Sequence, residues 1–219
     1  MKIDAFDRIC LLLLILAVGV TFVFYNQMPD PVPTHFGLDG TPNGFTAKPL
    51  GAWLMVLTML GTLVLFWLIP VISPKGFRVE KFRRSFGIIK LSMVVFMFLL
   101  NLFIVLRAIS VNLPIERVMP GLVGLFFIVL GNFLGKVTKN FFIGIRTPWT
   151  LASEEVWRKT HRLGGYTFFF AGLLMIIGSL MNLGGAWLMV VILVAVGIPV
   201  VYSFVIYSKV EGFKRENGE

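Results

Sequence analysis

The chain has 219 residues, of which 57% are hydrophobic and only 14% are charged, and its net charge is +9. A soluble domain is about one quarter charged, so this composition excludes a disordered chain and argues strongly against a soluble globular one. The single cysteine, Cys10, excludes an internal disulfide and a cysteine-based zinc site. Most of the chain is therefore expected to lie in lipid.

Six segments are long and apolar enough to cross a bilayer, which requires about 20 consecutive, mostly apolar residues. Lipid offers no partner to unpaired backbone groups, so each segment is expected to be an α-helix and the protein an all-α integral membrane protein. In chain order the segments are 9–25, 50–72, 86–106, 118–134, 166–182 and 186–208. The first resembles a secretory signal with a weak cleavage match at Ala17-Val18-Gly19, but the apolar run continues to Tyr25, which favours a retained span.

Basic residues are unevenly distributed between the connecting segments. If the chain crosses the membrane at every span, sixteen Lys and Arg residues fall on the side of the termini and three on the other side, with Lys90 inside a span. The positive-inside rule then predicts that both termini are cytoplasmic. This sidedness accounts for the basic charge without nucleic acid, and a basic inner face suits anionic lipid head groups.

The basic segment 73–85 is the expected boundary between two units. Residues 1–72 are expected to form a two-helix unit around a Pro- and Gly-rich outer loop, 28–49. Residues 86–219 are expected to form a four-helix unit with a long cytoplasmic loop, 136–165.

Small and polar residues inside the spans are expected to serve helix packing. Gly131 and Gly135 have the spacing that lets helix backbones approach closely in lipid. Asn101 and Asn132 are expected to form interhelical hydrogen bonds, and Lys90 is expected to snorkel to the cytoplasmic surface.

The outer loop is expected to be stiff and folded. It holds five of the eleven prolines, and Asp39-Gly40 and Asn43-Gly44 are strong turn signals. Two interpretations stay open: a structural cap, in which an apolar cluster of Val32, Phe36, Leu38 and Phe45 covers the helices and His35 bonds to the backbone, or a loop that contacts a ligand. The candidate contact residues are His35, Phe36, Asn43, Phe45 and Lys48. These side chains offer too few ligands for a metal site, so no metal is expected.

The second half of the cytoplasmic loop is expected to be a short amphipathic helix at the membrane interface. Ser153 is the expected N-cap, and Glu155 can pair with Arg158 and Lys159. Trp157 is the expected interfacial anchor, and Gly164-Gly165 is expected to end the helix. The polar and aromatic side chains of this loop either belong to the membrane surface or bind an anionic head group or the acidic side chain of a partner. The partner-binding candidates of the cytoplasmic side are Arg83, Arg84, Asn140, Arg146, Thr147, Trp149, Trp157, His161 and Arg162.

Catalysis has no support in the sequence. There is no nucleophile motif, phosphate loop or HExxH motif, and neither an enzyme nor a cofactor is expected. None of the six spans holds an Asp or Glu, which argues against a proton path or a transporter. A small-solute or lipid transporter, with Asn101, Asn132, Pro120 and Pro199 marking polar or broken helices, stays an alternative. A membrane enzyme using His35 or His161 is a weaker one.

Two stretches of the sequence resemble a known family. Residues 31–37, with Asn43-Gly44-Phe45 and Lys48, resemble the short domain of unknown function at the N-terminus of SdpI-type membrane proteins. Residues 131–136, 140–151, Val156-Trp157, Thr160-His161-Arg162 and Gly164 resemble the C-terminal signature of the same family. With the six spans, the resemblance covers nearly the whole chain.

The resemblance to the SdpI family implies a function. Well-understood members of this family are bacterial immunity proteins, which protect a producing cell from its own secreted, membrane-active peptide toxin. They also act as receptors that hold a small autorepressor at the membrane when toxin is present. The resemblance therefore implies a multi-pass protein of the bacterial cytoplasmic membrane, with a peptide toxin as partner on the outer face, a repressor on the cytoplasmic face, surrounding lipids, and no direct contact with nucleic acid.

Overall fold

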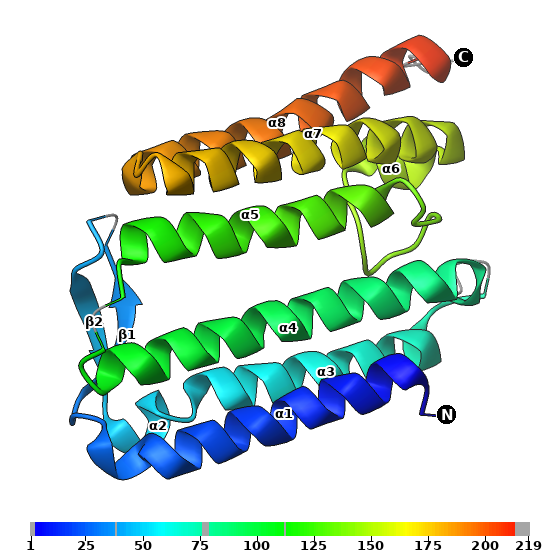
Figure 1. Ribbon diagram of the computed structural model, residues 1–219. Coiled ribbons are helices and arrows are strands. Elements are labelled where there is room, and N and C mark those ends of the chain that lie inside the picture. The colour runs from blue at the N-terminus through cyan, green and yellow to red at the C-terminus, as the bar shows by residue number, and fades with distance from the viewer. Residues whose placement is uncertain (1–2, 38, 76–78, 112, 213–219) are drawn as a thin grey trace, which may run out of the picture.

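The computed structural model describes residues 3–37, 39–75, 79–111 and 113–212. Within these residues, six helices run along the length of the molecule (Figure 1). They are α1 (Ala5–Phe24), α3 (Leu54–Ile72), α4 (Arg83–Ala108), α5 (Ile115–Leu134), α7 (Glu154–Leu180) and α8 (Gly184–Val210). Each is long and apolar enough to span a membrane, so the expected six-span helical fold is confirmed.

Shorter elements occupy the connections between these helices. The described part of the outer loop, for which the sequence predicted a stiff, folded structure, holds two paired strands. A short helix, α6, precedes α7 at the opposite end. The short elements are η1 (Tyr25–Gln27), β1 (Val32–Phe36), β2 (Pro42–Thr46), α2 (Lys48–Gly51), η2 (Val79–Phe82) and α6 (Pro148–Ala152).

The strands β1 and β2 form an antiparallel hairpin in which Val32 lies opposite Thr46 and Pro33 opposite Phe45. A proline has no backbone N–H to give to a sheet, so prolines are confined to edge strands. Both strands of a two-stranded hairpin are edges, and this sheet therefore tolerates Pro33 and Pro42. Because prolines are unusual in strands, the proline-rich composition of the loop gave no indication of a sheet.

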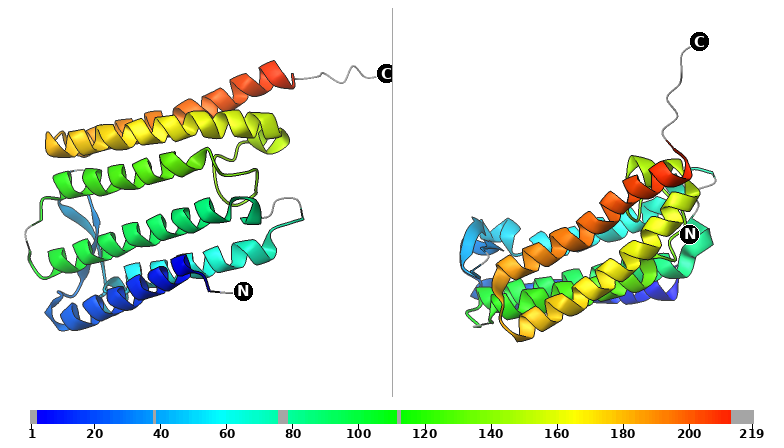
Figure 2. Two further views of the ribbon diagram at one scale, coloured as in Figure 1. Left: turned by 45° about the vertical axis from the view of Figure 1, so that its right-hand side comes forward. Right: turned by 90° about the horizontal axis from the view of Figure 1, so that it is seen from above.

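The six long helices form two groups that meet at α4 and α5. α4 packs against α1 and α3 on one side and against α5 on the other, while α7 packs against α5 and α8. The first helix begins and the last one ends at the same end of the bundle, and the hairpin lies at the opposite end (Figure 1, Figure 2). We call these the terminal end and the hairpin end. The expected division of the chain at residues 73–85 stays a prediction.

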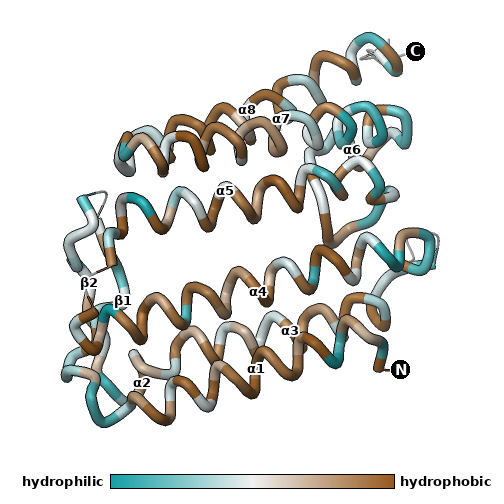
Figure 3. The backbone as a smooth tube through the Cα atoms, viewed as in Figure 1, coloured by the Kyte–Doolittle hydropathy of each residue, from teal (hydrophilic) through white to brown (hydrophobic). Residues whose placement is uncertain are grey.

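Apolar side chains cover the middle of the helices on the outside of the bundle as well as the inside. Figure 3 shows that hydrophobic residues run along the helices and that hydrophilic residues lie mainly at the two ends of the bundle. Ile15 of α1, Leu65 of α3 and Leu193 of α8 are 65%, 53% and 66% exposed. Large apolar side chains exposed to this extent all around a bundle need an apolar solvent, which a bilayer provides.

Glycines let α5 and α7 approach until their backbones touch. A Cβ atom on Gly131 would lie 2.6 Å from the backbone nitrogen of Phe169, and one on Gly124 would lie 2.7 Å from the carbonyl oxygen of Gly172. Gly165 faces Gly131 from α7, since a Cβ there would lie 2.9 Å from the Gly131 oxygen. Without a hydrophobic drive between helices in lipid, such close van der Waals packing is a main source of their association.

The expected end of the amphipathic helix at Gly164-Gly165 is wrong. Ser153 caps the helix as expected, because its side chain accepts the N–H of Val156, but the helix then runs without a break to Leu180. A glycine inside a helix costs about 1 kcal/mol relative to alanine. Here the close approach to Gly131 requires a residue without a side chain, so the glycine serves packing and does not end the helix.

Other polar and proline residues of the spans fit into continuous helices. Asn101 pairs with Thr21 of α1, its Nδ2 lying 3.3 Å from the threonine Oγ1, as expected for an interhelical bond. Asn132 instead donates to the Ile128 carbonyl oxygen of its own helix at 3.0 Å, so the interhelical bond predicted for it is not formed. Pro120 and Pro199 lie inside α5 and α8 without breaking them.

Candidate functional site

The hairpin is fastened to the bundle at its base by Lys48. Its Nζ donates to the carbonyl oxygen of Met28 at 2.8 Å and lies 5.0 Å from the centre of the Tyr25 ring. Its backbone N–H donates to Asp30 Oδ1 at 3.0 Å. A cation beside the unpaired carbonyls that follow a helix is favourable. Lys48, a candidate ligand contact, therefore serves to hold the hairpin in place.

Phe36 also faces inward. Its ring meets that of Phe103 of α4 edge to face, with 6.2 Å between the ring centres. Val32, the first residue of β1, is fully buried among side chains of α1, α4 and Ala52, which follows α2. These contacts make part of the apolar cluster that the sequence predicted for the cap; Leu38 lies outside the described residues.

The remaining three hairpin candidates are exposed. His35 and Asn43 face each other across the strands, with 2.5 Å between His35 Nδ1 and Asn43 Oδ1. An amide oxygen only accepts, so the imidazole Nδ1 is the donor, and His35 bonds to a side chain where the cap interpretation expected a backbone partner. Phe45 is 56% exposed, unlike Val32, to which it is close in the sheet. His35, Asn43 and Phe45 are therefore the hairpin residues available to a partner.

The turn of the hairpin is set by Asp39. Its carboxylate accepts the hydroxyl of Thr41 at 2.8 Å and the backbone N–H of the same residue at 3.1 Å. The threonine hydroxyl and N–H stabilise the charged form and hold the pKa of the Asp39 carboxyl below its ordinary value. Gly40 follows with a φ of 74°, which glycine adopts without strain.

At the terminal end, the α5–α6 loop (residues 135–147) is folded around Asn140. The Asn140 Oδ1 accepts the backbone N–H groups of Phe142 and Ile143 at 2.8 and 2.7 Å. Its Nδ2 donates to the carbonyl oxygens of Thr138 and Ile143, both at 2.9 Å. The side chain is 1% exposed and both its donor hydrogens and its acceptor are used. Asn140 therefore shapes the loop and is not available to a partner.

His161 joins this loop to α7. Its Nε2 accepts the backbone N–H of Ile145 at 2.9 Å, and its Nδ1 lies 2.9 Å from the carbonyl oxygen of Trp157. A backbone N–H only donates, so Nε2 carries a lone pair and Nδ1 carries the proton. The ring is fully buried and stacks on Trp157, with 3.9 Å between the ring centres. Gly144, with a φ of 118°, lies so close to His161 Nε2 that a Cβ would overlap it.

Trp157 is a core residue. It is 2% exposed, and its Nε1 donates to the Val137 carbonyl oxygen at 2.8 Å. The prediction that it anchors the helix at the membrane interface is therefore wrong. Because a buried indole N–H needs a partner, a tryptophan beside a loop carbonyl fits this position. The buried cluster around it contains side chains of α3, η2 and α4, so the loop packs against the first group of helices.

Thr147 and Thr150 fix α6 beside α8. Thr147 caps α6 by accepting the N–H of Thr150 at 3.2 Å, and its hydroxyl lies 3.0 Å from that of Ser203 in α8. Trp149 meets Phe204 of α8 edge to face, with 5.1 Å between the ring centres. Thr147 is buried, and Trp149 is half-buried.

Apart from the half-buried Trp149, the candidates of the terminal end divide into two sets. Asn140, Thr147, Trp157 and His161 are buried and build the loop. The four arginines, by contrast, are exposed: Arg83, Arg84, Arg146 and Arg162. Arg146 donates to the Phe141 carbonyl oxygen, and Arg83 lies 3.9 Å from Asp4. Only the arginine set displays charge to a partner.

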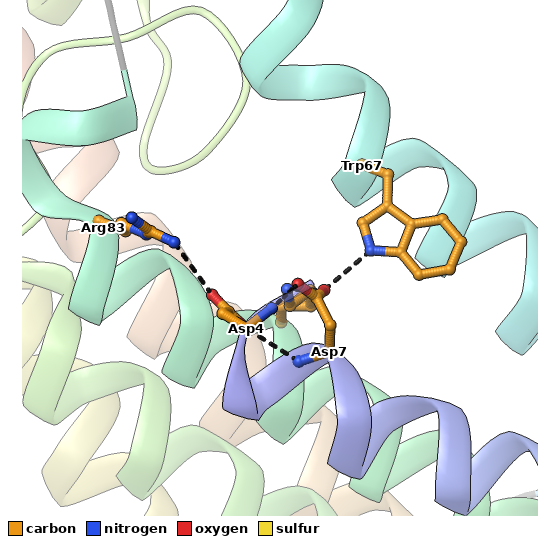
Figure 4. Close-up of polar contacts among 5 residues, drawn as sticks. Asp4, Asp7, Trp67 and Arg83 are labelled. Atoms are coloured by element: carbon orange, nitrogen blue, oxygen red, sulfur yellow. Dashed lines mark hydrogen bonds and ion pairs between the residues drawn. The ribbon is translucent and has the colours of Figure 1, made fainter. Parts of the chain in front are cut away.

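A buried ion pair at the start of α1 was missed by the sequence analysis. Asp7 and Lys90 of α4 are 4% and 3% exposed, and Asp7 Oδ1 lies 2.5 Å from the Lys90 ammonium. Trp67 of α3 donates its Nε1 to the same oxygen at 2.8 Å. Figure 4 shows this indole directed at Asp7, with Asp4 turned towards Arg83 at the other side. Beside the pair lies a cavity of about 370 Å³.

This pair corrects two expectations. Lys90 does not snorkel to the surface, and α1 does contain a buried acid, because it begins at Ala5 and not at residue 9. A buried charge is tolerated only when paired and hydrogen-bonded, and the pair supplies both. The sequence did hold a signal for the start of α1, because Asp4 and Asp7 have the spacing of a capping box, and in the structure they form that box. The predicted span instead began after the last charged residue, Arg8.

The described residues contain no group of three His, Cys, Asp or Glu side chains that could hold a metal ion. These residues define a polytopic membrane protein. It carries a folded hairpin at one end of six helices and, at the other end, the folded α5–α6 loop with Arg146, which we call the arginine-bearing loop.

Comparison with known proteins narrows this class. A model of the SdpI/YfhL protein family matches residues 136–203, and a model of a domain of unknown function, DUF1648, matches residues 12–60. The Immunity protein SdpI of Bacillus subtilis (strain 168) is 24% identical over 208 residues, which cover 93% of this chain and 97% of that protein. No solved structure matches significantly. The chain is thus similar to the SdpI family at both folded connections and along nearly its whole length, and it is a multi-pass protein of the bacterial cytoplasmic membrane.

Proposed function

We propose that this protein is an immunity protein that protects its cell from a secreted, membrane-active peptide toxin. One observation carries the proposal: the chain is similar over 93% of its length to a protein named Immunity protein SdpI. The two matched segments contain the two folded connections, the hairpin and most of the α5–α6 loop with α6, so the similarity includes the ends of the bundle as well as its apolar helices.

The hairpin end faces outward in this proposal and the terminal end faces the cytoplasm. Lys48, Arg107 and Arg117 are the basic residues near the hairpin end. Basic residues are much denser near the terminal end, where Arg8, Lys81, Arg83, Arg84, Lys136, Lys139, Arg146, Arg158, Lys159, Arg162 and Lys209 lie. The positive-inside rule supports this orientation. Cysteine labelling of intact cells at Asn43→Cys and at Arg158→Cys, in a Cys10→Ala background, tests it: only Asn43→Cys is expected to react with an impermeant reagent.

His35, Asn43 and Phe45 are the proposed toxin contacts. They are the exposed members of the hairpin candidates, whereas Lys48 and Phe36 are used to hold the hairpin on the helices. An exposed aromatic ring beside two hydrogen-bonding side chains suits an amphipathic peptide at a membrane surface. The proposed mechanism is capture of the toxin at the outer surface before it permeabilises the bilayer.

The test is a toxin challenge of cells that lack the gene and carry either the wild-type protein or a variant. Wild type is expected to restore survival. The highest toxin dose that cells survive is expected to be at least tenfold lower for the triple variant His35→Ala, Asn43→Ala, Phe45→Ala, which corresponds to about 1.4 kcal/mol of contact energy. Gln27→Ala, an exposed substitution outside the hairpin at the same end, is the matched control, and membrane immunoblots equalise expression. Equal survival of deleted and wild-type cells would disprove the immunity function.

A receptor function is proposed for the terminal end. Arg83, Arg84, Arg146 and Arg162 would hold a small cytoplasmic repressor at the membrane through its acidic side chains, because arginine presents several donors in a fixed geometry. Membranes from toxin-treated cells are expected to retain the repressor, and retention is expected to fall for Arg84→Gln with Arg146→Gln. Arg158→Gln is the control. Retention that is unchanged by the double variant and by high salt would count against an arginine contact.

A further inference from the structure

A groove with a volume of about 520 Å³ lies between α5 and α7 towards the terminal end. Gly131, Gly135 and Gly165 line its floor, where the two helix backbones come together, and they add no side chain that would fill the groove. The aromatic rings of Phe169 and Phe170 form an apolar wall, and Phe170 is 58% exposed. The groove is thus apolar on the side of the membrane centre.

The polar rim of the groove is cationic. Lys136, just after α5, and Arg162 of α7 both line it, together with the amide of Asn132 and the ring of Tyr166. No carboxylate is among the lining residues. Arg162 makes no ion pair or hydrogen bond with any residue that the structure describes, in contrast to Lys159 one turn before it, which pairs with Glu155 at 2.6 Å.

Arg162 lies at the depth of lipid head groups. Leu180, the last residue of α7, lies eighteen positions after it, a rise of roughly 27 Å at 1.5 Å per residue. The hydrocarbon core is about 30 Å thick, so with Leu180 at one boundary the guanidinium of Arg162 reaches the other. The cationic rim then faces phosphates and the aromatic wall faces acyl chains.

We propose that this groove is a binding site for an anionic phospholipid of the phosphatidylglycerol type. Its phosphodiester sits between Lys136 and Arg162, Asn132 and Tyr166 contact the head group, and an acyl chain lies along Phe169 and Phe170. Basic pockets between transmembrane helices are known to suit anionic head groups. A zwitterionic lipid fits less well, because its ammonium finds no carboxylate in the groove. The proposal does not rest on the immunity function.

Native mass spectrometry of the full-length protein in detergent tests the proposal. Phosphatidylglycerol, phosphatidylethanolamine and phosphatidylcholine with the same acyl chains are titrated in turn, and inorganic phosphate is a fourth probe. Wild type is expected to bind phosphatidylglycerol at least about fivefold more tightly than either zwitterionic lipid, the effect of one basic residue near a charged surface. Excess inorganic phosphate is expected to leave the lipid bound, because it lacks the acyl chain.

Variants separate this groove from general surface charge. Lys136→Gln with Arg162→Gln is expected to abolish the preference, and the charge-preserving pair Lys136→Arg with Arg162→Lys to retain it. Arg158→Gln removes the same charge from α7 outside the groove and is expected to bind like wild type. The melting temperature of each variant in phosphatidylcholine reports whether it is folded.

Three results would overturn the proposal: equal affinity of wild type for all three lipids, a preference that survives the double glutamine variant, or an equal loss in Arg158→Gln. Displacement of phosphatidylglycerol by inorganic phosphate would show that the groove binds a soluble anion instead. If the double glutamine variant does not fold, Arg162→Gln alone against Arg158→Gln gives the same comparison.

Discussion

The imidazole of His161 accepts the backbone N–H of Ile145 at 2.9 Å, sixteen positions earlier in the chain. This bond joins α7 to the α5–α6 loop from inside, where no partner protein reaches it. Loss of partner binding on substitution of His161 would therefore report a disturbed loop and not a lost contact. The exposed arginines of the same end are the residues on which a direct contact can be tested.

We expect the acceptor on the His161 ring to matter more than its volume. His161→Phe fills the space but leaves the Ile145 N–H unpaired, which costs about 1–3 kcal/mol when the group is buried. His161→Gln keeps an acceptor and should lose less. The melting temperature in detergent should fall in the order wild type, Gln, Phe. Equal melting temperatures for Phe and wild type would contradict the bond's importance.

Gly144→Ala should destabilise the same loop. Gly144 has a φ of 118°, and a Cβ there would overlap the His161 ring. Backbone strain of this kind costs about 1–3 kcal/mol, and the displaced ring adds to it. Gly61→Ala is the matched control, because nothing lies within 4 Å of a Cβ at that position. Limited proteolysis between α5 and α6 should increase for Gly144→Ala only; resistance equal to that of the control would refute the prediction.

Removing one partner of the Asp7–Lys90 pair should be costly, and removing both less so. Asp7→Asn has one acceptor oxygen, so it keeps either the Trp67 bond or the bond from the Asp4 N–H. It also leaves the Lys90 ammonium buried without a counter-charge, at a cost of about 3–5 kcal/mol. Lys90→Met strands the carboxylate in the same way. The double variant should recover part of the loss in chemical unfolding.

The exposed pair Glu155–Lys159 provides the comparison for this double-mutant cycle. Glu155→Gln should cost far less stability than either substitution of the buried pair, because water already solvates both charges. If the two single substitutions at Asp7 and Lys90 were as mild as this, or simply additive in the double variant, the buried pair would not be the coupled unit that its burial implies.

The hairpin turn should open on acidification, and only below the ordinary pKa of an aspartate. Thr41 holds the pKa of Asp39 below that value. A folded-state pKa that is lowered contributes stability above the unfolded-state pKa, and this contribution is lost as the pH falls through the folded-state pKa. Thr41→Val should raise the pKa of Asp39 towards its ordinary value, which an NMR titration of the carboxyl carbon measures. An unchanged pKa of Asp39 in Thr41→Val would show that the Thr41 hydroxyl does not lower it.

The six spans could be predicted from sequence because hydrophobic length is a local property. The helix cap at Ser153 and the Glu155–Lys159 pair are local as well and were predicted correctly. Lys90 was misplaced because its partner lies eighty-three positions away. A lone lysine near a helix end is typical of snorkelling, and only the tertiary contact with Asp7 changes that interpretation.

The sequence located the signature around Asn140 and His161 but left open whether its polar side chains belong to the membrane surface or bind a partner. Polar residues gathered in one loop are typical of a binding site, and the sequence cannot tell whether they face outward or bond to the loop's own backbone. The structure turns Asn140 and His161 inward, and both satisfy backbone groups. Gly164-Gly165 was misread for a related reason: a glycine pair ends many helices, and only the approach of α5 shows that here it is a contact.

The helix α4 contacts the hairpin at one end of the molecule and the α5–α6 loop at the other. Phe103 of α4 contacts Phe36 of the hairpin, while Phe86 and Ile89 near its start share a buried cluster with Val137 and Trp157. The 26 residues of α4 are hydrogen-bonded without a break, a rod of roughly 39 Å. In the proposed orientation, a shift or tilt imposed on the hairpin from outside the cell would thus be delivered mechanically to the base of the arginine-bearing loop, with no ion or small messenger crossing the bilayer.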